Sequence, residues 1–211
     1  MHISWLGTSA IRIQTKPLTE DVIIAIDPYK PLKGSFPRSL APQIGLFSRG
    51  EAGSITLSGN PFILSNPGEC ETKGVLVTAV QGHEAEASLP AGRQVFFRID
   101  SEYMSVAHLG NAKKELTNKQ LEILGDIDIL IVPVGNGDVY DADQAVKAVN
   151  AIDPRIVIPM WYKSDNDAGA KPVSEFIKAF GAKDIVEEAK TIIKKKDLPQ
   201  EDTRVIVLTK E

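Results

Sequence analysis

The sequence of 211 residues contains one cysteine, Cys70, and three histidines, His2, His83 and His108. A single cysteine excludes an intramolecular disulfide framework and a cysteine-rich zinc knuckle. Two-metal hydrolases normally draw most of their ligands from histidine side chains, so the low histidine count argues against a histidine-rich metal centre.

Two further absences limit the class of protein. No apolar run approaches the roughly 20 residues that a membrane helix needs, and the N-terminal segment MHISWLGTSAIRIQT lacks the basic start and apolar run of a signal peptide. The net charge is −4, whereas general nucleic-acid binders normally carry a basic excess. We therefore expect a cytoplasmic protein that binds neither a membrane nor nucleic acid.

The residues that are present have the composition of an ordinary globular domain, with 43% apolar and 25% charged side chains. A chain of this length can bury its own core without help from disulfides. Neither a linker nor an internal repeat interrupts the sequence, so we predict a single domain that spans residues 1–211.

The apolar pattern predicts an α/β fold in which strands come first and helices later. Alternating or continuous apolar runs, which are typical of strands, occur at residues 3–5, 11–13, 22–26, 44–47, 62–64, 75–80, 95–99, 127–132, 156–158 and 205–208. Helical spacing predicts helices that begin at Thr117, span residues 142–152, and span residues 174–180 up to Gly181. This order indicates two sheets with helices packed outside.

Several long segments together carry a family resemblance. They are WLGTSAIRI, IDPY, GNPFILSNPGE, KGVLV, AHLGN, ELTNKQLEILGDIDILIVPVG, DPRIVIPMWYK and KKKDLPQEDTRVIVL. In order and approximate spacing they resemble the bacterial metallo-β-lactamase-fold hydrolases similar to L-ascorbate-6-phosphate lactonase, over nearly the whole chain. The resemblance implies an αββα four-layer sandwich with the active site on loops at the strand ends.

The resemblance also implies a metal site. This sequence has different residues at most of the positions where the family carries the metal ligands. In the family, an HxHxDH motif, a lone histidine, an HLGD aspartate and an IPMHY histidine hold one or two zinc or manganese ions. Here the HxHxDH motif falls on SRGEAGS, and residues 29–81 contain neither histidine nor aspartate. Thr8 replaces an early histidine, Asn111 the HLGD aspartate, and Trp161 the IPMHY histidine. Only His83 remains at a ligand-like position.

One histidine does not form a catalytic zinc site, which usually needs three protein ligands. The acidic ligands are lost together with the histidines, and Arg49 and Glu51 could neutralise each other in the SRGEAGS stretch. A cleft adapted to the absence of a dication would have this charge pattern. The sequence therefore predicts a metal-free relative that uses no cofactor, with Trp161 in the space of the former metal.

Seven residues are candidates for a ligand pocket in this cleft, and no residue is assigned a catalytic role. The candidates are Asp27, Arg49, Glu51, His83, His108, Asn111 and Trp161.

Structural roles compete with functional ones at several of these positions. His83 either binds a ligand or is a hydrogen-bonded loop residue, and His108 is expected to be a satisfied, partly buried histidine. Asp27 and Glu69 either transfer protons or order loops through backbone hydrogen bonds. Cys70 is either a thiolate served by His83 or a small buried side chain.

Three hypotheses for the function stay open at this point. The first is a catalytically silent module for binding or assembly, whose partner is a second copy of the chain or an active paralogue. The second is an active lactonase-like hydrolase with a metal on His83, Glu84 and Glu86. The third is metal-independent catalysis at Cys70 or His83. Whether the chain is an enzyme is therefore left open by the sequence.

Overall fold

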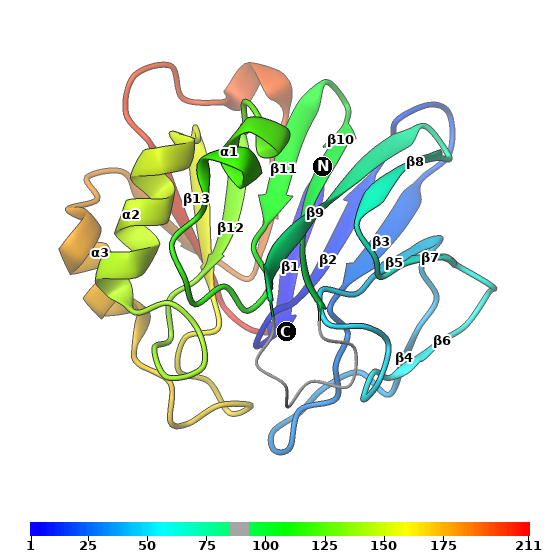
Figure 1. Ribbon diagram of the computed structural model, residues 1–211, viewed down its shortest axis with the longest axis horizontal. Helices are drawn as coiled ribbons and strands as arrows, with labels where there is room; N and C mark the ends of the chain where they lie inside the picture. Colours follow the sequence, from blue (N-terminus) through cyan, green and yellow to red (C-terminus); the bar gives the residue numbers. More distant parts are fainter. Residues whose placement is uncertain (85–92) are drawn as a thin grey trace.

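The computed structural model of the chain describes residues 1–84 and 93–211, and for residues 83, 84 and 93 it describes the backbone alone. Two large β-sheets form its centre (Figure 1). The strands of the smaller sheet, in spatial order, are β15 (Lys190–Ile192), β1 (His2–Gly7), β2 (Ala10–Thr15), β3 (Val22–Ile26), β5 (Ile44–Leu46) and β7 (Phe62–Leu64).

The larger sheet contains strands from the middle and the end of the chain. In spatial order they are β14 (Ile185–Glu188), β16 (Arg204–Leu208), β13 (Ile156–Met160), β12 (Ile129–Pro133), β11 (Met104–His108), β10 (Arg93–Ser101), β9 (Val75–Glu84) and β8 (Gly68–Thr72). Two short parallel strands, β4 (Ser39–Leu40) and β6 (Thr56–Leu57), pair with each other outside both sheets.

The helices begin and end where the sequence carries capping residues. Their bounds are α1 (Asn118–Leu124), α2 (Ala142–Ile152), α3 (Val173–Phe180) and the 3₁₀ turn η1 (Lys195–Asp197). Thr117 caps α1 in a reciprocal capping box with Gln120, and Gly181 ends α3 in the left-handed conformation at φ 67°. No helix in the described ranges is long and apolar enough to span a bilayer.

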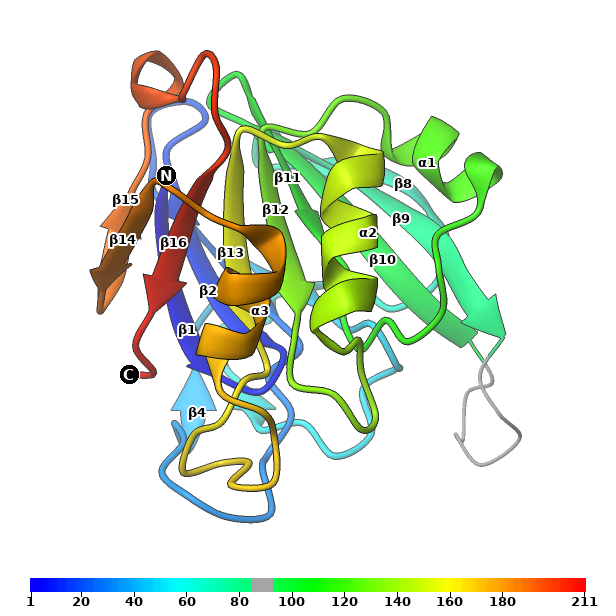
Figure 2. The ribbon, with the colours of Figure 1, turned by 90° about the vertical axis from the view of Figure 1, so that its left-hand side faces the viewer.

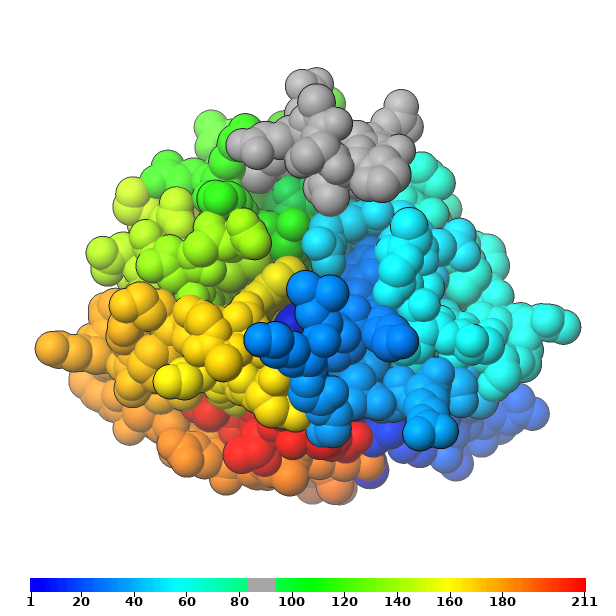
Figure 3. All heavy atoms as spheres, turned by 90° about the horizontal axis from the view of Figure 1, so that it is seen from below, coloured from blue at the N-terminus to red at the C-terminus, as the bar shows by residue number. Residues whose placement is uncertain are grey.

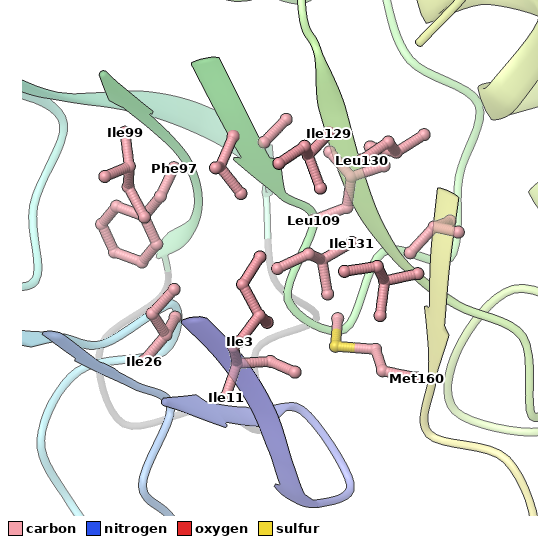
Figure 4. Close-up of a cluster of buried hydrophobic side chains, with 14 of the residues drawn as sticks. Ile3, Ile11, Ile26, Phe97, Ile99, Leu109, Ile129, Leu130, Ile131 and Met160 are labelled. Carbon is pink, nitrogen blue, oxygen red and sulfur yellow. The ribbon is translucent and has the colours of Figure 1, made fainter. Parts of the chain in front are cut away.

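The core lies between the two sheets. Ile3, Ile11 and Ile26 of the smaller sheet are fully buried, and Figure 4 shows them facing the larger sheet. Phe97 and Ile131 lie on the opposite side of this cluster and are buried as completely. The predicted packing of two sheets, each with one apolar face, is therefore present.

The helical layer covers only the larger sheet in the part of the chain that the structure describes. Figure 2 shows α2 and α3 in front of that sheet, with β1 and β2 behind it. The outer face of the smaller sheet carries polar side chains such as Arg12 and Gln14, which alternate with the buried Ile11 and Ile13. A sheet with one polar face needs no helix over it. In the described ranges, the second helical layer of the αββα sandwich that the resemblance implied is therefore absent.

The topology brings the ends of several strands to one edge of the molecule. β1, β3 and β5 run in one direction in the smaller sheet, because β2 is antiparallel to both β1 and β3. β11, β12 and β13 are parallel in the larger sheet. The loops that leave these strands form the candidate site.

Candidate functional site

Four non-glycine residues in the described loops at this edge have left-handed backbone conformations, and one of them is Asn136 at φ 66° in the loop after β12. Thr8 follows β1 at φ 46°, Asp27 follows β3 at φ 48°, and Trp161 follows β13 at φ 57°. Such conformations cost about 1–2 kcal/mol each for residues with a Cβ. They persist only where surrounding contacts enforce them, and they concentrate at functional sites.

Asp27 holds the loop that follows β5. Its Oδ1 accepts a hydrogen bond from the Ser48 backbone N–H at 2.7 Å, and its Oδ2 accepts one from the Ser48 hydroxyl at 2.6 Å. Both residues are completely buried. Gly110 packs against Ser48 so closely that a Cβ there would lie 2.8 Å from the Ser48 Cβ. Asp27 therefore orders the loop, which is the structural alternative that the sequence left open.

His108 is a buried histidine with both ring nitrogens occupied. Its Nδ1 accepts a hydrogen bond from the Gly110 N–H at 3.2 Å, so Nε2 carries the proton and donates to the Ser9 carbonyl at 2.9 Å. Burial lowers the pKa of His108 below its ordinary value, although the charge of Asp27 opposes this effect. The predicted role as a satisfied histidine is confirmed, with burial complete rather than partial.

Hydrogen bonds from its backbone and its indole ring hold Trp161 in place. Its backbone N–H donates to the Thr8 carbonyl at 3.1 Å, and its indole Nε1 donates to Oδ2 of Asp167 at 3.2 Å. Gly135, which lies two residues beyond β12, approaches the Trp161 carbonyl so closely that a Cβ there would lie 1.9 Å from the oxygen. The loops after β1, β12 and β13 thus hold one another.

Arg49 contacts two aromatic rings rather than an acid. Its guanidinium carbon lies 4.6 Å from the ring centroid of Tyr29 and 5.7 Å from that of Trp161. The Tyr29 hydroxyl accepts from the Arg49 backbone N–H and donates to the Gly50 carbonyl, each at 2.9 Å. Burial raises the pKa of Tyr29 above its ordinary value, which keeps the phenol a donor.

The neutralisation of Arg49 by Glu51, which the sequence allowed, does not occur between the described side chains. No ion pair joins these two side chains among the residues described, and Glu51 is exposed. The cause is the fold of the loop, because Tyr29 binds the backbone on both sides of Arg49 and its ring packs against the guanidinium. The Arg49 Nε is buried without a hydrogen-bond partner.

A cavity of about 490 Å³ opens above this group of side chains. Figure 3 shows this face, where the yellow segment of residues 161–169 meets the blue segment of residues 29–33. The lining residues are Thr8, Tyr29, Lys30, Pro31, Leu32, Lys33, Arg49, Trp161, Asn166, Asp167, Ala168 and Gly169. A second cavity, of about 400 Å³, shares Trp161 and Asp167 and lies against residues 135–138.

The structure brings some of the predicted pocket residues together and separates others. Arg49 and Trp161 line the cavity, whereas Asp27 and His108 are buried beneath it. Asn111 accepts a hydrogen bond from the Gln94 amide at 2.9 Å and is not in the cavity lining. His83 belongs to β9, but its side chain lies outside the described part of the chain, as do the side chain of Glu84 and all of Glu86.

Cys70 and His83 are too far apart to act together. Cys70 pairs with Val77 across β8 and β9, and His83 lies further along β9, about 20 Å away at about 3.3 Å per residue. Cys70 is half-buried, and burial and the charge of Glu69 raise the pKa of its thiol. A thiolate nucleophile served by His83 is therefore excluded.

The positively charged side of the cavity was not predicted from the sequence. Tyr29, Lys30 and Lys33 line it, although only the segment IDPY had drawn attention to this loop. The sequence signal for this positive charge was the pair Lys30 and Lys33, which follows a predicted strand and the acidic residue Asp27. Asp167 was missed because its role depends on the contact with Trp161.

Comparisons with known proteins agree on the fold. Residues 2–161 match the model of the beta-lactamase superfamily domain. UPF0173 metal-dependent hydrolases of Methanosarcina mazei and Methanopyrus kandleri are 26% and 24% identical, over 87% and 77% of this chain and 92% and 84% of theirs. A Thermotoga maritima protein assigned to the zinc-dependent hydrolases of the metallo-beta-lactamase superfamily has a TM-score of 0.80 at 23% identity, over 98% of this chain and 97% of that chain.

These matches confirm the predicted fold class. The structural likeness shows a shared fold, and the names of the relatives describe those proteins alone. The resemblance to the ascorbate-6-phosphate lactonase branch stays a prediction.

Proposed function

The chain belongs to the metallo-β-lactamase-fold family of metal-dependent hydrolases, and we propose that it is a member without a catalytic metal, which acts as a binding or assembly module. The observation that carries this proposal is the contact of Arg49 with Tyr29 and Trp161 at the strand ends. A guanidinium and an indole together occupy the region where the resemblance places metal ligands.

The donor groups at this edge do not fit a zinc or manganese ion. Asp27 is bound to Ser48, both nitrogens of His108 are used, and Asp167 accepts from Trp161 and from two backbone N–H groups. Within residues 1–84 and 93–211, apart from the side chains of 83, 84 and 93, no three histidine, cysteine or acidic side chains come together as a metal-binding group. Catalytic zinc usually has three protein ligands.

Charge supports the same proposal. The Arg49 guanidinium forms no ion pair with a described acid, so a metal dication beside it would be repelled by an uncompensated positive charge. This repulsion is unfavourable in a partly buried site. An anion would instead be attracted. The arrangement therefore favours binding of a ligand over activation of a metal-bound water.

The competing function is hydrolysis with a metal held by His83, Glu84 and Glu86. The names of the relatives favour it, since those proteins are called metal-dependent hydrolases. The two functions are separated by assaying generic lactone and phosphodiester substrates with added zinc or manganese, and again with a chelator. We expect no turnover above the buffer rate in either condition. Turnover that a chelator abolishes would contradict the proposal and establish the hydrolase.

Substitution of Trp161 by histidine tests the proposal at the position of a missing ligand. We expect Trp161→His to bind zinc no more tightly than the unaltered chain, because one imidazole cannot replace the other absent donors. Zinc titration by calorimetry measures this, with Trp161→Phe as the control for loss of the indole. Tight zinc binding by Trp161→His but not by Trp161→Phe would show that further ligands are present nearby.

A further inference from the structure

We infer that the 490 Å³ cavity binds a small organic anion, with the Arg49 guanidinium as the fixed positive charge that receives it. This inference rests on the proposed metal-free function and names the class of ligand that the site takes. It is carried by the charge of the lining, the fixed orientation of Arg49, and the apolar surface beside it.

The lining has an excess of positive charge. Lys30, Lys33 and Arg49 all contribute to it, and none of them forms an ion pair with a described residue. Among the described lining residues, Asp167 is the one that carries an acidic side chain. Its Oδ2 accepts from the Trp161 indole, and its Oδ1 accepts from the backbone N–H groups of residues 169 and 170. Because these donors already occupy the carboxylate, the three cations are left for a ligand.

Arg49 is held in place before any ligand arrives. The rings of Tyr29 and Trp161 both contact its guanidinium, and the backbone on either side of it is bound to the Tyr29 hydroxyl. Contact with aromatic rings does not use the guanidinium N–H groups as hydrogen-bond donors, and the buried Nε of Arg49 has no hydrogen-bond partner among the described residues. These donors suit the oxygens of a carboxylate or a phosphate, and a fixed side chain loses little entropy when it binds them.

Apolar surface in the same cavity indicates an organic anion rather than a bare inorganic one. Leu32 lines the cavity and has a fully exposed side chain, at 101% of its reference area. Pro31 and the ring of Trp161 extend this surface. An exposed leucine next to unpaired cations matches a ligand that has an apolar or aromatic part attached to its anionic group.

Calorimetric titration of the metal-depleted full chain with phenyl phosphate, benzoate and inorganic phosphate tests the inference. We expect the two aromatic anions to bind more tightly than phosphate, and the affinity to weaken as salt is added. Arg49→Gln should weaken binding about tenfold or more, because it removes a charge-assisted hydrogen bond. Lys33→Gln should weaken binding about threefold, because the charge that it removes is exposed and screened by solvent. Arg38→Gln and Lys119→Gln remove exposed charges outside the cavity lining and should leave the affinity unchanged.

Each alternative outcome has a separate meaning. Absence of binding up to about 10 mM of every probe, in protein that is also free of metal, would overturn this inference and leave the metal-free proposal standing. Binding that requires added zinc or manganese would overturn both. Equal weakening by Lys33→Gln and Lys119→Gln would show that general charge, not this cavity, attracts the anion. Lys33 is exposed, so its variant decides the question even if Arg49→Gln does not fold.

Discussion

Replacement of Asp27 by alanine is expected to lower the free energy of unfolding by about 3 kcal/mol. The carboxylate accepts two hydrogen bonds from Ser48, at 2.6 and 2.7 Å, and both residues are fully buried. Without the carboxylate, the Ser48 N–H and hydroxyl stay buried without partners, which costs about 1–3 kcal/mol for each group. Urea unfolding followed by circular dichroism measures the change.

Asp27→Asn is the matched control for this prediction. Asparagine tolerates the left-handed conformation at φ 48°, and its carbonyl can still accept from the Ser48 N–H. We therefore expect Asp27→Asn to cost about 1 kcal/mol, the size of a typical net hydrogen bond. A loss below about 1 kcal/mol for Asp27→Ala would mean that the carboxylate does not hold the loop, and would revive its alternative role in acid–base chemistry.

Gly135→Ala is expected to destabilise the chain by about 3 kcal/mol, the upper part of the range for overpacking. The added Cβ would lie 1.9 Å from the Trp161 carbonyl oxygen, which belongs to the backbone and cannot rotate away. Relief requires the loop after β13 to move, and this displaces Trp161 from Arg49. We therefore expect weaker binding of phenyl phosphate in addition to the lower stability in urea.

Gly137→Ala separates this close approach from a general effect of substituting glycine. Gly137 lies in the same loop at φ +75°, and a Cβ there meets no atom within 4 Å. We expect a loss of about 1 kcal/mol from the left-handed conformation alone, with anion binding unchanged. If both variants lose the same stability and the same affinity, the contact between residues 135 and 161 does not position the site.

Local sequence signals predicted the interior of the fold well. The helix predicted at residues 142–152 has those bounds in the structure. Thr117, where another helix was predicted to begin, is the N-cap of α1. The hairpin around residues 7–9 was visible because Ile11 and Ile13 alternate with polar residues, and that alternation places one face in the core. Continuous β-branched runs gave the buried strands for the same reason.

Three of the four edge strands described in the two large sheets were missed, while the fourth, β7, was predicted at residues 62–64. β14, β15 and β8 are paired at the edges of their sheets, and their side chains are largely exposed or half-buried. A strand such as β8, with the sequence GECET, has no apolar face strong enough to distinguish it from a loop. The prediction of a single domain over residues 1–211 stays a prediction.

The candidate site was predicted in part. The missing metal ligands pointed to the edge of the molecule where two of the candidates, Arg49 and Trp161, line the same cavity. Their contact could not be predicted, because it depends on how the two sheets bring the ends of β5 and β13 together. From the sequence, the nearby Glu51 was the candidate partner for Arg49. In the structure, the ring of Tyr29 contacts the guanidinium instead.

Elemental analysis of the tag-free protein, purified without chelator, tests the central claim most directly. The proposed function predicts far less than one zinc, manganese or iron ion per chain, because the described donors at the cleft are already bound by other protein groups. One or more of these ions per chain, retained through dialysis, would contradict it.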